Sequence, residues 1–390
     1  MATISAARSS LVALALAATS PLASAQSCKP LETREANAPH QRPAFAGQTR
    51  ACADPSEVAI DVAVLAKGLE KPWAVEPLPN GELLVTEKAG RLRVVSAKGD
   101  IGAPISGVPK VDARGQGGLL DVALSPAFEK DRTIFLSYAE PREGGNGTAV
   151  ARAVLSGQAL ESVRVVFRAM PTYAGTMHYG SRLAFGPDGM LYVSTGDRSD
   201  APMRKYAQDP KSTLGKVVRM APDGSRQEIF SGGHRNVQAM AFDGEGRLWV
   251  VEHGTRGGDE LNLVEKGKNY GWPLVAYGEE YSGKPIAGAV TAKSGFEQPV
   301  YYWDPVIAPS GAQFYSGKLF PGWRGSLFTG ALKDRALVRI RIEDGKVTGE
   351  EHLLAERAQR IRDVREGPDG ALYIVTDETN GEIWKLAPRR

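Results

Sequence analysis

Residues 233–272 combine charged, amide and glycine residues to an extent that a connecting loop does not require. Glycines let a backbone turn sharply and present its carbonyl and N–H groups to a ligand. Asp259 and Glu260 supply hard oxygen ligands for a metal, and Arg235 and Arg256 can bind an anion. The stretch therefore predicts a site for an anion, for an oxygen-ligated metal, or for both. Two solvated turns between strands are the alternative interpretation.

Further polar motifs recur at equivalent positions of a repeat, each just before a predicted inner strand. They are RGQGG at 114–118, HYGSR at 178–182, GHRN at 233–236, APSG at 308–311 and RIRD at 360–363. His178 is the candidate base, because imidazole changes protonation state near neutral pH; a hydrogen-bonded structural histidine is the alternative. The candidate binding groups are the amides of Gln116 and Asn236 and the cations of Arg235, Lys333, Arg360 and Arg362. These cations favour an anionic ligand with several carboxylates or phosphates, unless they form ordinary salt bridges.

The elements that must position these residues are strand–turn–strand repeats. Clear copies cover residues 73–87, 183–196, 239–252 and 364–376, and looser copies cover 119–138 and 312–331. Turns containing Asn-Gly or Asp-Gly suit tight hairpins, and alternating apolar residues mark strands with one face in a core. No long amphipathic helix separates the copies, which disfavours parallel βαβ folds. We therefore expect an all-β fold, a six-bladed β-propeller with four-stranded antiparallel blades, over residues 55–390.

A propeller gathers the loops that lead into its inner strands around one central channel. The polar motifs should therefore meet at one mouth of that channel, where loops can form a ligand site. No glycine-rich phosphate loop or dinucleotide fingerprint follows a strand, which argues against a nicotinamide nucleotide.

The composition is that of a soluble globular protein, with 42% hydrophobic and 24% charged residues among 390. Residues 1–25 are predicted to be a signal peptide, with Arg8 before an apolar run at 11–18 and a cleavage site after Ala25. No segment is apolar for long enough to span a membrane, so we expect a periplasmic or secreted protein. Loss of Arg8 lowers the net charge from +3 to +2, a balance that argues against nucleic acid as a partner.

Cys28 and Cys52 are the two cysteines of the chain. In an oxidising compartment they are expected to form a structural disulfide. No histidine pattern accompanies them, so a metal or catalytic role is disfavoured. Residues 26–54 are then an N-terminal arm, which we expect to lie ordered on the surface of the propeller.

Five motifs are together specific for one protein family. They are QGGLL at 116–120, GHRN at 233–236, GGDE at 257–260, KNYGWP at 268–273 and RIRD at 360–363. Through them the chain resembles the soluble, pyrroloquinoline-quinone-dependent aldose sugar dehydrogenases of the glucose/sorbosone dehydrogenase group. The resemblance covers essentially the whole mature chain. It implies a six-bladed propeller with pyrroloquinoline quinone (PQQ) over the channel mouth, and oxidation of the C1 hydroxyl of cyclic aldoses to lactones.

The resemblance also implies roles for individual residues. His178 matches the general base that takes the proton of the sugar hydroxyl, and Arg235 would stabilise negative charge on the reduced quinone. The residues that match cofactor-binding positions are Gln116, Arg235, Asn236, Tyr281, Lys333, Arg360 and Arg362. Calcium is implied twice, once against the cofactor on the carbonyls of Gly254 and Thr255, and once on the Glu260 carboxylate and the Tyr270 carbonyl. Glu252 and Asp259 are expected to fix loops.

Three positions depart from the glucose-oxidising branch of that family. Met177 stands where that branch has an aspartate assisting the base, His253 replaces a glutamine, and Val306 replaces a cofactor-contacting threonine. These changes affect sugar preference and rate more than reaction type. The expected partners are an aldose and an external electron acceptor, and the expected state is a monomer or weak dimer. A metal-dependent lactonase-type propeller and a non-enzymatic binding propeller are the rival hypotheses.

Overall fold

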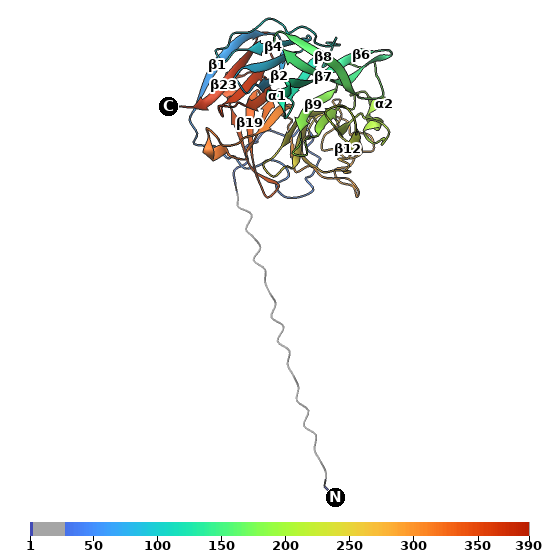
Figure 1. The fold of residues 1–390 in the computed structure, drawn as a ribbon. Helices are drawn as coiled ribbons and strands as arrows, with labels where there is room; N and C mark the ends of the chain where they lie inside the picture. Colours follow the sequence, from blue (N-terminus) through green and yellow to red (C-terminus); the bar gives the residue numbers. More distant parts are fainter. Residues whose placement is uncertain (3–27, 390) are drawn as a thin grey trace.

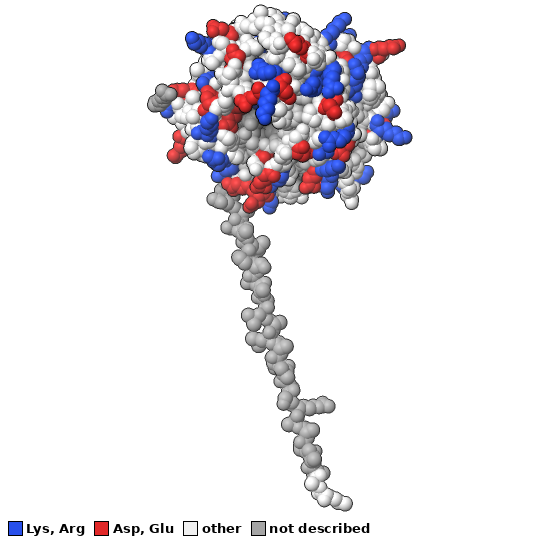
Figure 2. Space-filling model, viewed as in Figure 1, with Lys and Arg blue, Asp and Glu red and all other residues white. Residues whose placement is uncertain are grey.

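The computed structural model describes residues 1–2 and 28–389 (Figure 1). Residues 3–27, which make up almost all of the predicted signal peptide, and residue 390 lie outside the described part. Within that part, no helix has the length and the apolar character that are needed to cross a membrane. Basic and acidic side chains alternate over the face seen in Figure 2, without a large area of one sign.

Six antiparallel sheets surround a central axis, which confirms the predicted six-bladed β-propeller (Figure 1). The first three sheets contain β2 (Pro72–Pro77), β3 (Leu83–Glu87) and β4 (Arg91–Val95); β5 (Leu119–Leu124), β6 (Thr133–Arg142), β7 (Gly145–Ser156) and β8 (Ala159–Arg168); and β9 (Gly180–Phe185), β10 (Leu191–Thr195), β11 (Lys216–Met220) and β12 (Glu228–Gly232). The other three contain β13 (Val237–Phe242), β14 (Leu248–Glu252), β15 (Asp259–Val264) and β16 (Tyr301–Trp303); β17 (Pro309–Phe314), β18 (Leu327–Ala331), β19 (Ala336–Glu343) and β20 (Lys346–Leu353); and β21 (Ile361–Glu366), β22 (Leu372–Thr376), β23 (Gly381–Pro388) and β1 (Ile60–Leu69).

One blade differs from the four-stranded pattern. The sheet β2–β3–β4 has three strands, and a single bridge between Val95 and Ile101 stands at its outer edge. The helices described between the strands are single turns: α1 (Phe128–Asp131), α2 (Ala201–Arg204), η1 (Lys205–Ala207), η2 (Pro321–Trp323) and η3 (Ala355–Arg357).

The six predicted repeats are the inner hairpins of the six blades. Their first strands, β2, β5, β9, β13, β17 and β21, contact one another in a closed ring around the axis. Gly189 and Gly370 have positive φ in the turns that close two of these hairpins, as expected for Asp-Gly turns. Apolar side chains fill the space between neighbouring blades: Val85 of β3, for example, belongs to one buried cluster with Val375 of β22. The ring is therefore held by burial of apolar surface between blades.

The ring closes between the two ends of the described chain. β1 pairs antiparallel with β23, from Ile60 opposite Pro388 to Leu69 opposite Gly381, as the outer strand of the last blade (Figure 1). The sequence predicted that the first and last blades meet but did not show which strands join them.

A buried ion network blocks the middle of the channel. Arg182 of β9 lies 3.2 Å from carboxylate oxygens of both Asp121 and Asp363, and its guanidinium stacks 4.1 Å over the Trp73 ring. Beyond it, Arg365 donates to Asp363 at 3.1 Å and lies 3.5 Å from Glu76. These residues separate the channel into two mouths. The mouth at the C-terminal ends of the inner strands holds a cavity of about 410 Å³, here called the distal cavity, with Glu76 and Arg365 in its wall.

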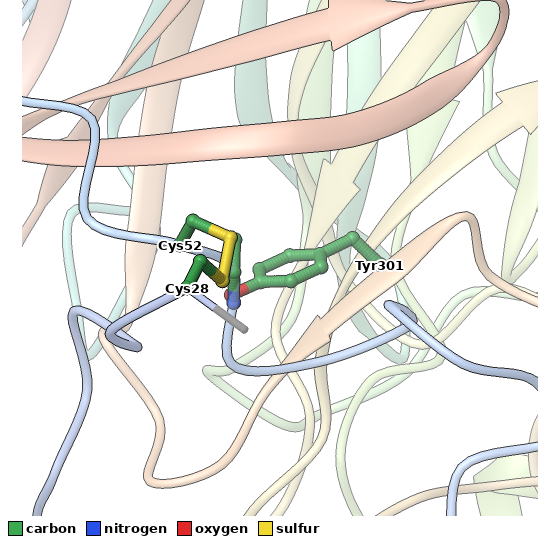
Figure 3. The surroundings of a disulfide bond; sticks show 4 residues. Cys28, Cys52 and Tyr301 are labelled. Carbon is green, nitrogen blue, oxygen red and sulfur yellow. A yellow bond between two sulfur atoms is a disulfide. The ribbon is translucent and has the colours of Figure 1, made fainter. Parts of the chain in front are cut away.

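The predicted disulfide between Cys28 and Cys52 is confirmed, with the two Cα atoms 5.5 Å apart (Figure 3). The arm beside it packs on the fourth and fifth blades. The Tyr301 hydroxyl accepts a hydrogen bond from the Ala51 amide at 2.9 Å, next to the disulfide in Figure 3. The Asp54 amide donates to the carbonyl of Glu350 on β20 at 3.0 Å. These contacts hold the arm against the two blades.

Candidate functional site

The mouth at the N-terminal ends of the inner strands holds a polar cavity of about 300 Å³, here called the cationic cavity. Every blade contributes to its wall. Its polar and aromatic lining residues are Lys71, Trp73, Lys88, Gln116, Tyr179, Asn236, Gln238, His253, Arg360, Arg362 and Asp377. Three separate motifs thus meet around one cavity, through the predicted residues Gln116, Asn236, Arg360 and Arg362.

The candidate base lies beside this cavity, directly before the lining residues Tyr179 and Gly180. His178 is only 4% exposed and has a left-handed φ of 50°. Its backbone amide donates to the Gln116 side-chain oxygen at 2.8 Å, and its Nδ1 lies 2.7 Å from Asp197 Oδ1. His178 is therefore held from two sides in a backbone conformation that non-glycine residues rarely adopt. Such backbone strain is common at functional sites.

Asp197 orients the His178 ring. It also accepts hydrogen bonds from Trp272 Nε1 and the Ser199 amide, both at 2.7 Å. Although burial alone raises the pKa of Asp197, its hydrogen bond and charge interaction with His178 hold that pKa below the ordinary range. The ionised carboxylate accepts from Nδ1–H, which leaves the lone pair on Nε2 free. Burial, with the nearby Arg235 charge, lowers the pKa of His178 against the effect of Asp197, so the ring is neutral and basic at pH 7.

Sequence reasoning did not find Asp197, although a signal for it was present. In the predicted hairpin, Thr195 of β10 pairs with Gly180 of β9. Continuing that register by two residues places Asp197 opposite His178. Met177, directly before the base, carries no carboxylate. The carboxylate beside the base comes instead from Asp197, just after β10, the second strand of the hairpin.

Two arginines and one aspartate form the opposite wall. Arg360 and Arg362 each donate to Asp377 Oδ2 at 2.9 Å. Two cations share one carboxylate, and although burial alone raises the pKa of Asp377, the arginines hold it below the ordinary range. The Arg362 Nε is buried and has no hydrogen-bond partner among the described residues. With Lys71 and Lys88 also in the lining, this wall carries positive charge that its own carboxylate does not neutralise.

Arg235 joins the base to the neighbouring loops. Asp197 donates its amide to the Arg235 carbonyl at 2.9 Å, and the Arg235 guanidinium lies 5.3 Å from the centre of the Trp272 ring. Its Nε is a second buried N–H without a partner among the residues described. Glu252 accepts from the Arg235 amide at 2.7 Å and lies 2.8 Å from His234. Glu252 thereby fixes the backbone that carries Arg235.

Comparisons with known proteins agree with this geometry. The family model described as "Glucose / Sorbosone dehydrogenase" matches residues 69–385. The chain belongs to this family. The aldose sugar dehydrogenase YliI of Escherichia coli (strain K12) is 45% identical over 351 residues, which cover 85% of this chain and 93% of that protein.

Two solved structures extend the comparison. The soluble aldose sugar dehydrogenase of Escherichia coli, in its apo-form, aligns with a TM-score of 0.80 at 44% identity and covers 85% of this chain and 100% of its own. The PQQ-bound form of the aldose sugar dehydrogenase of Streptomyces coelicolor aligns with a TM-score of 0.72 at 32% identity and covers 86% and 100%. This member of the glucose/sorbosone dehydrogenase family is therefore an oxidoreductase.

The four metal ligands that the family resemblance implies lie around one small cavity. Gly254, Thr255, Glu260 and Tyr270 all line a space of about 20 Å³, together with Glu252. This volume holds roughly one water-sized group. Burial and the nearby charge of Glu252 raise the pKa of Glu260 well above its ordinary range. The two ligand pairs expected for separate ions are thus brought to a single cavity with room for one.

Oxygen atoms dominate this donor set, which suits calcium. Among the residues described, no group of three or more His, Cys, Asp or Glu side chains is arranged to hold a metal. An ion in the small cavity would therefore depend on backbone carbonyls. Asp259 fixes the loops around it, because its carboxylate accepts from the amides of Gly254, Ile307 and Ala308 at 2.8–2.9 Å.

Two predicted cofactor-binding residues lie away from the cationic cavity. Lys333 is exposed and lines a surface groove between the arm and the fifth blade. Tyr281 is 71% exposed, and its hydroxyl lies 3.4 Å from Arg235.

Of the departures from the glucose-oxidising branch, His253 lines the cationic cavity, and its Nε2 lies 2.6 Å from the Pro309 carbonyl. Burial lowers the pKa of His253 to about 3, so this ring is neutral and structural.

Proposed function

We propose that the chain oxidises the C1 hydroxyl of cyclic aldose sugars to lactones, with PQQ as the hydride acceptor. One observation carries the proposal: a neutral histidine, oriented by a buried carboxylate, stands beside a cavity with uncompensated positive charge. The proteins that resemble the chain include aldose sugar dehydrogenases and a PQQ-bound structure, which supports this substrate class and cofactor.

The residues present fit the proposed cofactor. PQQ carries three carboxylates and, when bound, supplies a two-electron acceptor for hydride. Arg360, Arg362, Lys71 and Lys88 would hold the carboxylates. The buried Nε of Arg362, which has no partner in the described part of the chain, offers them a donor. Gln116 and Asn236 present amides in the same wall. Lys333 and Tyr281 join this set only if their exposed side chains turn toward the cavity.

The proton and the hydride of the sugar go to different acceptors. His178 Nε2 accepts the proton of the C1 hydroxyl, while Asp197 keeps Nδ1 protonated and stabilises the imidazolium that forms. The C1 hydrogen leaves as hydride, so that C1–O becomes the lactone carbonyl. Arg235, whose Nε has no partner among the described residues, stabilises negative charge that grows beside it.

Calcium in the small cavity is part of the proposal. Glu260 would hold it together with the backbone carbonyls of Tyr270, Gly254 and Thr255, since these four residues line that cavity. When bound, the ion supplies a Lewis acid next to the cationic cavity. Arg235 and His253 line this small cavity too, so the two sites share a wall.

The location and processing of the chain remain proposals as well. We infer cleavage after Ala25 and export to the periplasm or the medium, where the Cys28–Cys52 disulfide is stable. The external electron acceptor is then a partner met outside the cytoplasm.

The experiment is reconstitution of the purified protein with Ca²⁺ and PQQ, followed by addition of aldoses and measurement of redox-dye reduction. Sugar-dependent reduction is expected. Confirmed quinone binding without any sugar-dependent reduction would refute the proposal. Lactone hydrolysis by the protein without quinone would support the rival lactonase, and absence of quinone affinity would support a non-enzymatic propeller.

A further inference from the structure

The N-terminal arm contacts the rim of the functional site, although it lies before residues 69–385, which the family model matches. Its segment at residues 34–41, here called the strap, reaches three loops. They are residues 278–279, 304–308 and 333–334. The strap is therefore a feature of this chain whose role the family match does not assign.

The strongest contact is reciprocal. The Asp304 carboxylate, only 6% exposed, accepts hydrogen bonds from the backbone amides of Asn37 at 2.5 Å and Ala38 at 3.1 Å. In return, the Asn37 side-chain oxygen accepts from the Val306 amide at 3.0 Å. Each segment thus satisfies backbone or carboxylate groups of the other, and loss of either leaves buried polar groups unpaired.

The loop held in this way contributes Ala308 to the wall of the cationic cavity. Two residues beyond Val306, Ala308 lines that cavity with a left-handed φ of 53°. The Ala308 carbonyl accepts from the amide of Leu332, a second lining residue, at 2.9 Å. Because a non-glycine residue with positive φ is unfavourable, the surrounding contacts must hold Ala308 in place.

The other two loops are held more weakly. The Gln41 side chain donates to the Gly278 carbonyl at 3.3 Å, and Gly278 lines the small cavity. Arg34 donates to the Asp334 carboxylate at 2.6 and 3.2 Å, next to Lys333. The Gln41 hydrogen bond is long, and the Arg34 contacts are exposed to solvent, so both contribute less than the Asn37–Asp304 pair.

The strap is anchored at both ends. The Cys28–Cys52 disulfide closes the arm, and Arg50 donates to the carbonyls of Glu32 and Asp304 at 3.0 Å. Asp54 continues the arm into its contact with β20. Cross-linking limits how far the strap can leave the propeller surface.

We propose that the strap is a positioning element for the functional site: by holding residues 304–308, it keeps the cavity wall in the geometry that binds the quinone. The inference rests on the proposed function for its ligand but not for the loop contacts themselves. Asn37 is the residue through which the strap acts on the Val306–Ala308 backbone.

The test compares Asn37→Ala with Arg42→Ala in the full chain. Arg42 lies on the same arm, but its guanidinium donates to the carbonyls of Pro39 and Gln41 within it. Amide hydrogen exchange is measured without added cofactor, and PQQ affinity is measured by absorbance titration in the presence of Ca²⁺. Asn37→Ala should speed exchange at residues 306–308 and weaken PQQ binding about tenfold, the effect of one hydrogen bond. Arg42→Ala should do neither.

Exchange in β14, which is buried in the fourth blade, separates a local effect from general destabilisation. Unchanged exchange at residues 306–308 in Asn37→Ala would overturn the proposal, and so would faster exchange there with unchanged PQQ affinity. Failure of the unmodified protein to bind PQQ would refute the proposed function. The exchange comparison would still decide whether the strap holds the loop.

Discussion

The two mouths of the central channel are built from opposite ends of the same six inner strands, yet they present charge differently. In the distal cavity, Arg365 faces the carboxylates of Asp363 and Glu76 and also donates to two backbone carbonyls, so its charge is compensated within the protein. In the cationic cavity, Arg360 and Arg362 share Asp377, and the Arg362 Nε has no partner among the described residues.

This difference separates a structural ion network from a binding site. Arginines are abundant at both ends, so their number does not identify a site. A buried N–H donor that remains unpaired costs free energy, and a ligand that accepts a hydrogen bond from it removes that cost. Among the described residues, the guanidinium Nε atoms of Arg235 and Arg362 are buried and unpaired. The base His178 lies at the same end of the channel, which agrees with the proposed anionic cofactor.

The largest expected effect is a loss of turnover, and it distinguishes the two mouths of the channel. His178→Ala should lower turnover about 100- to 10,000-fold, because it removes the imidazole that accepts the hydroxyl proton. PQQ affinity should change little. The measurement is dye reduction by aldoses, with a parallel absorbance titration of PQQ.

Glu76→Gln is the matched control at the distal mouth. Glu76 lies at the other end of the inner ring, and turnover should stay unchanged. Full activity of His178→Ala, or loss of activity in Glu76→Gln, would contradict the assignment of the two ends.

A second pair of variants separates PQQ affinity from the stability of the fold. Arg362→Ala should weaken PQQ binding about 10- to 100-fold, the effect of losing a charged hydrogen-bond donor to a carboxylate. Arg365→Ala should leave that affinity unchanged. It should lower the free energy of unfolding by about 3–5 kcal/mol, because it leaves Asp121 and Asp363 with Arg182 as their remaining close cation.

PQQ titration and urea unfolding of both variants measure these two effects. If Arg365→Ala weakens PQQ binding as much as Arg362→Ala, the two mouths do not differ in the way proposed.

The third prediction concerns Asp197. Its two oxygens both accept hydrogen bonds, so in Asp197→Asn an amide NH₂ must face a donor. We expect the turnover rate to fall about 10- to 100-fold through loss of ring orientation. The acid limb of the kcat/KM profile should lie below about pH 6.5 in the unmodified protein, because burial lowers the pKa of His178.

Asp197→Asn should shift the acid limb of the kcat/KM profile further. Asp197 opposes the effect of burial, so its loss lowers the pKa of His178 again and shifts the limb to lower pH. Profiles measured from pH 4 to 9 check the direction; a shift to higher pH would show that Asp197 does not favour the imidazolium.

The smallest effect is a pH dependence of stability at the distal mouth. Burial raises the pKa of Glu76 from 4.5 to about 7. The folded state therefore binds this proton more tightly than the unfolded chain, and stability is lost as the pH rises from about 4.5 to 7. Glu76→Gln should remove this slope in urea unfolding series at pH 5 and pH 8. An unchanged slope would show that the carboxylate is ionised and fully paired.

Much of the fold could be predicted because its signals are local. Each inner hairpin is encoded by a turn such as Pro187-Asp188-Gly189 between apolar strands, and six such units leave few alternatives to a propeller. The three-stranded first blade was not predicted. Whether a fourth strand forms depends on hydrogen-bond pairing at the edge of the sheet, and the alternation of apolar residues does not encode that pairing.

The site could be predicted only in part. Motifs before the inner strands gave Gln116, Asn236, Arg360 and Arg362, which the structure brings to one cavity. Lys333 has the same charge, but its loop position leaves it in a surface groove. The strap contacts join Asn37 to Asp304 across 267 residues, and no local pattern encodes such a distance.

The pairing of β1 with β23 also bears on how the chain folds. It joins Ile60 to Pro388, a separation in sequence that makes this contact among the slowest to form by diffusion of the unfolded chain. Until β23 is synthesised, β1 lacks its pairing partner in the sixth blade, and apolar residues of β1 such as Ala66 and Leu69 stay uncovered. We therefore expect ring closure to be a late folding event, and an interrupted chain to be prone to aggregation at this blade.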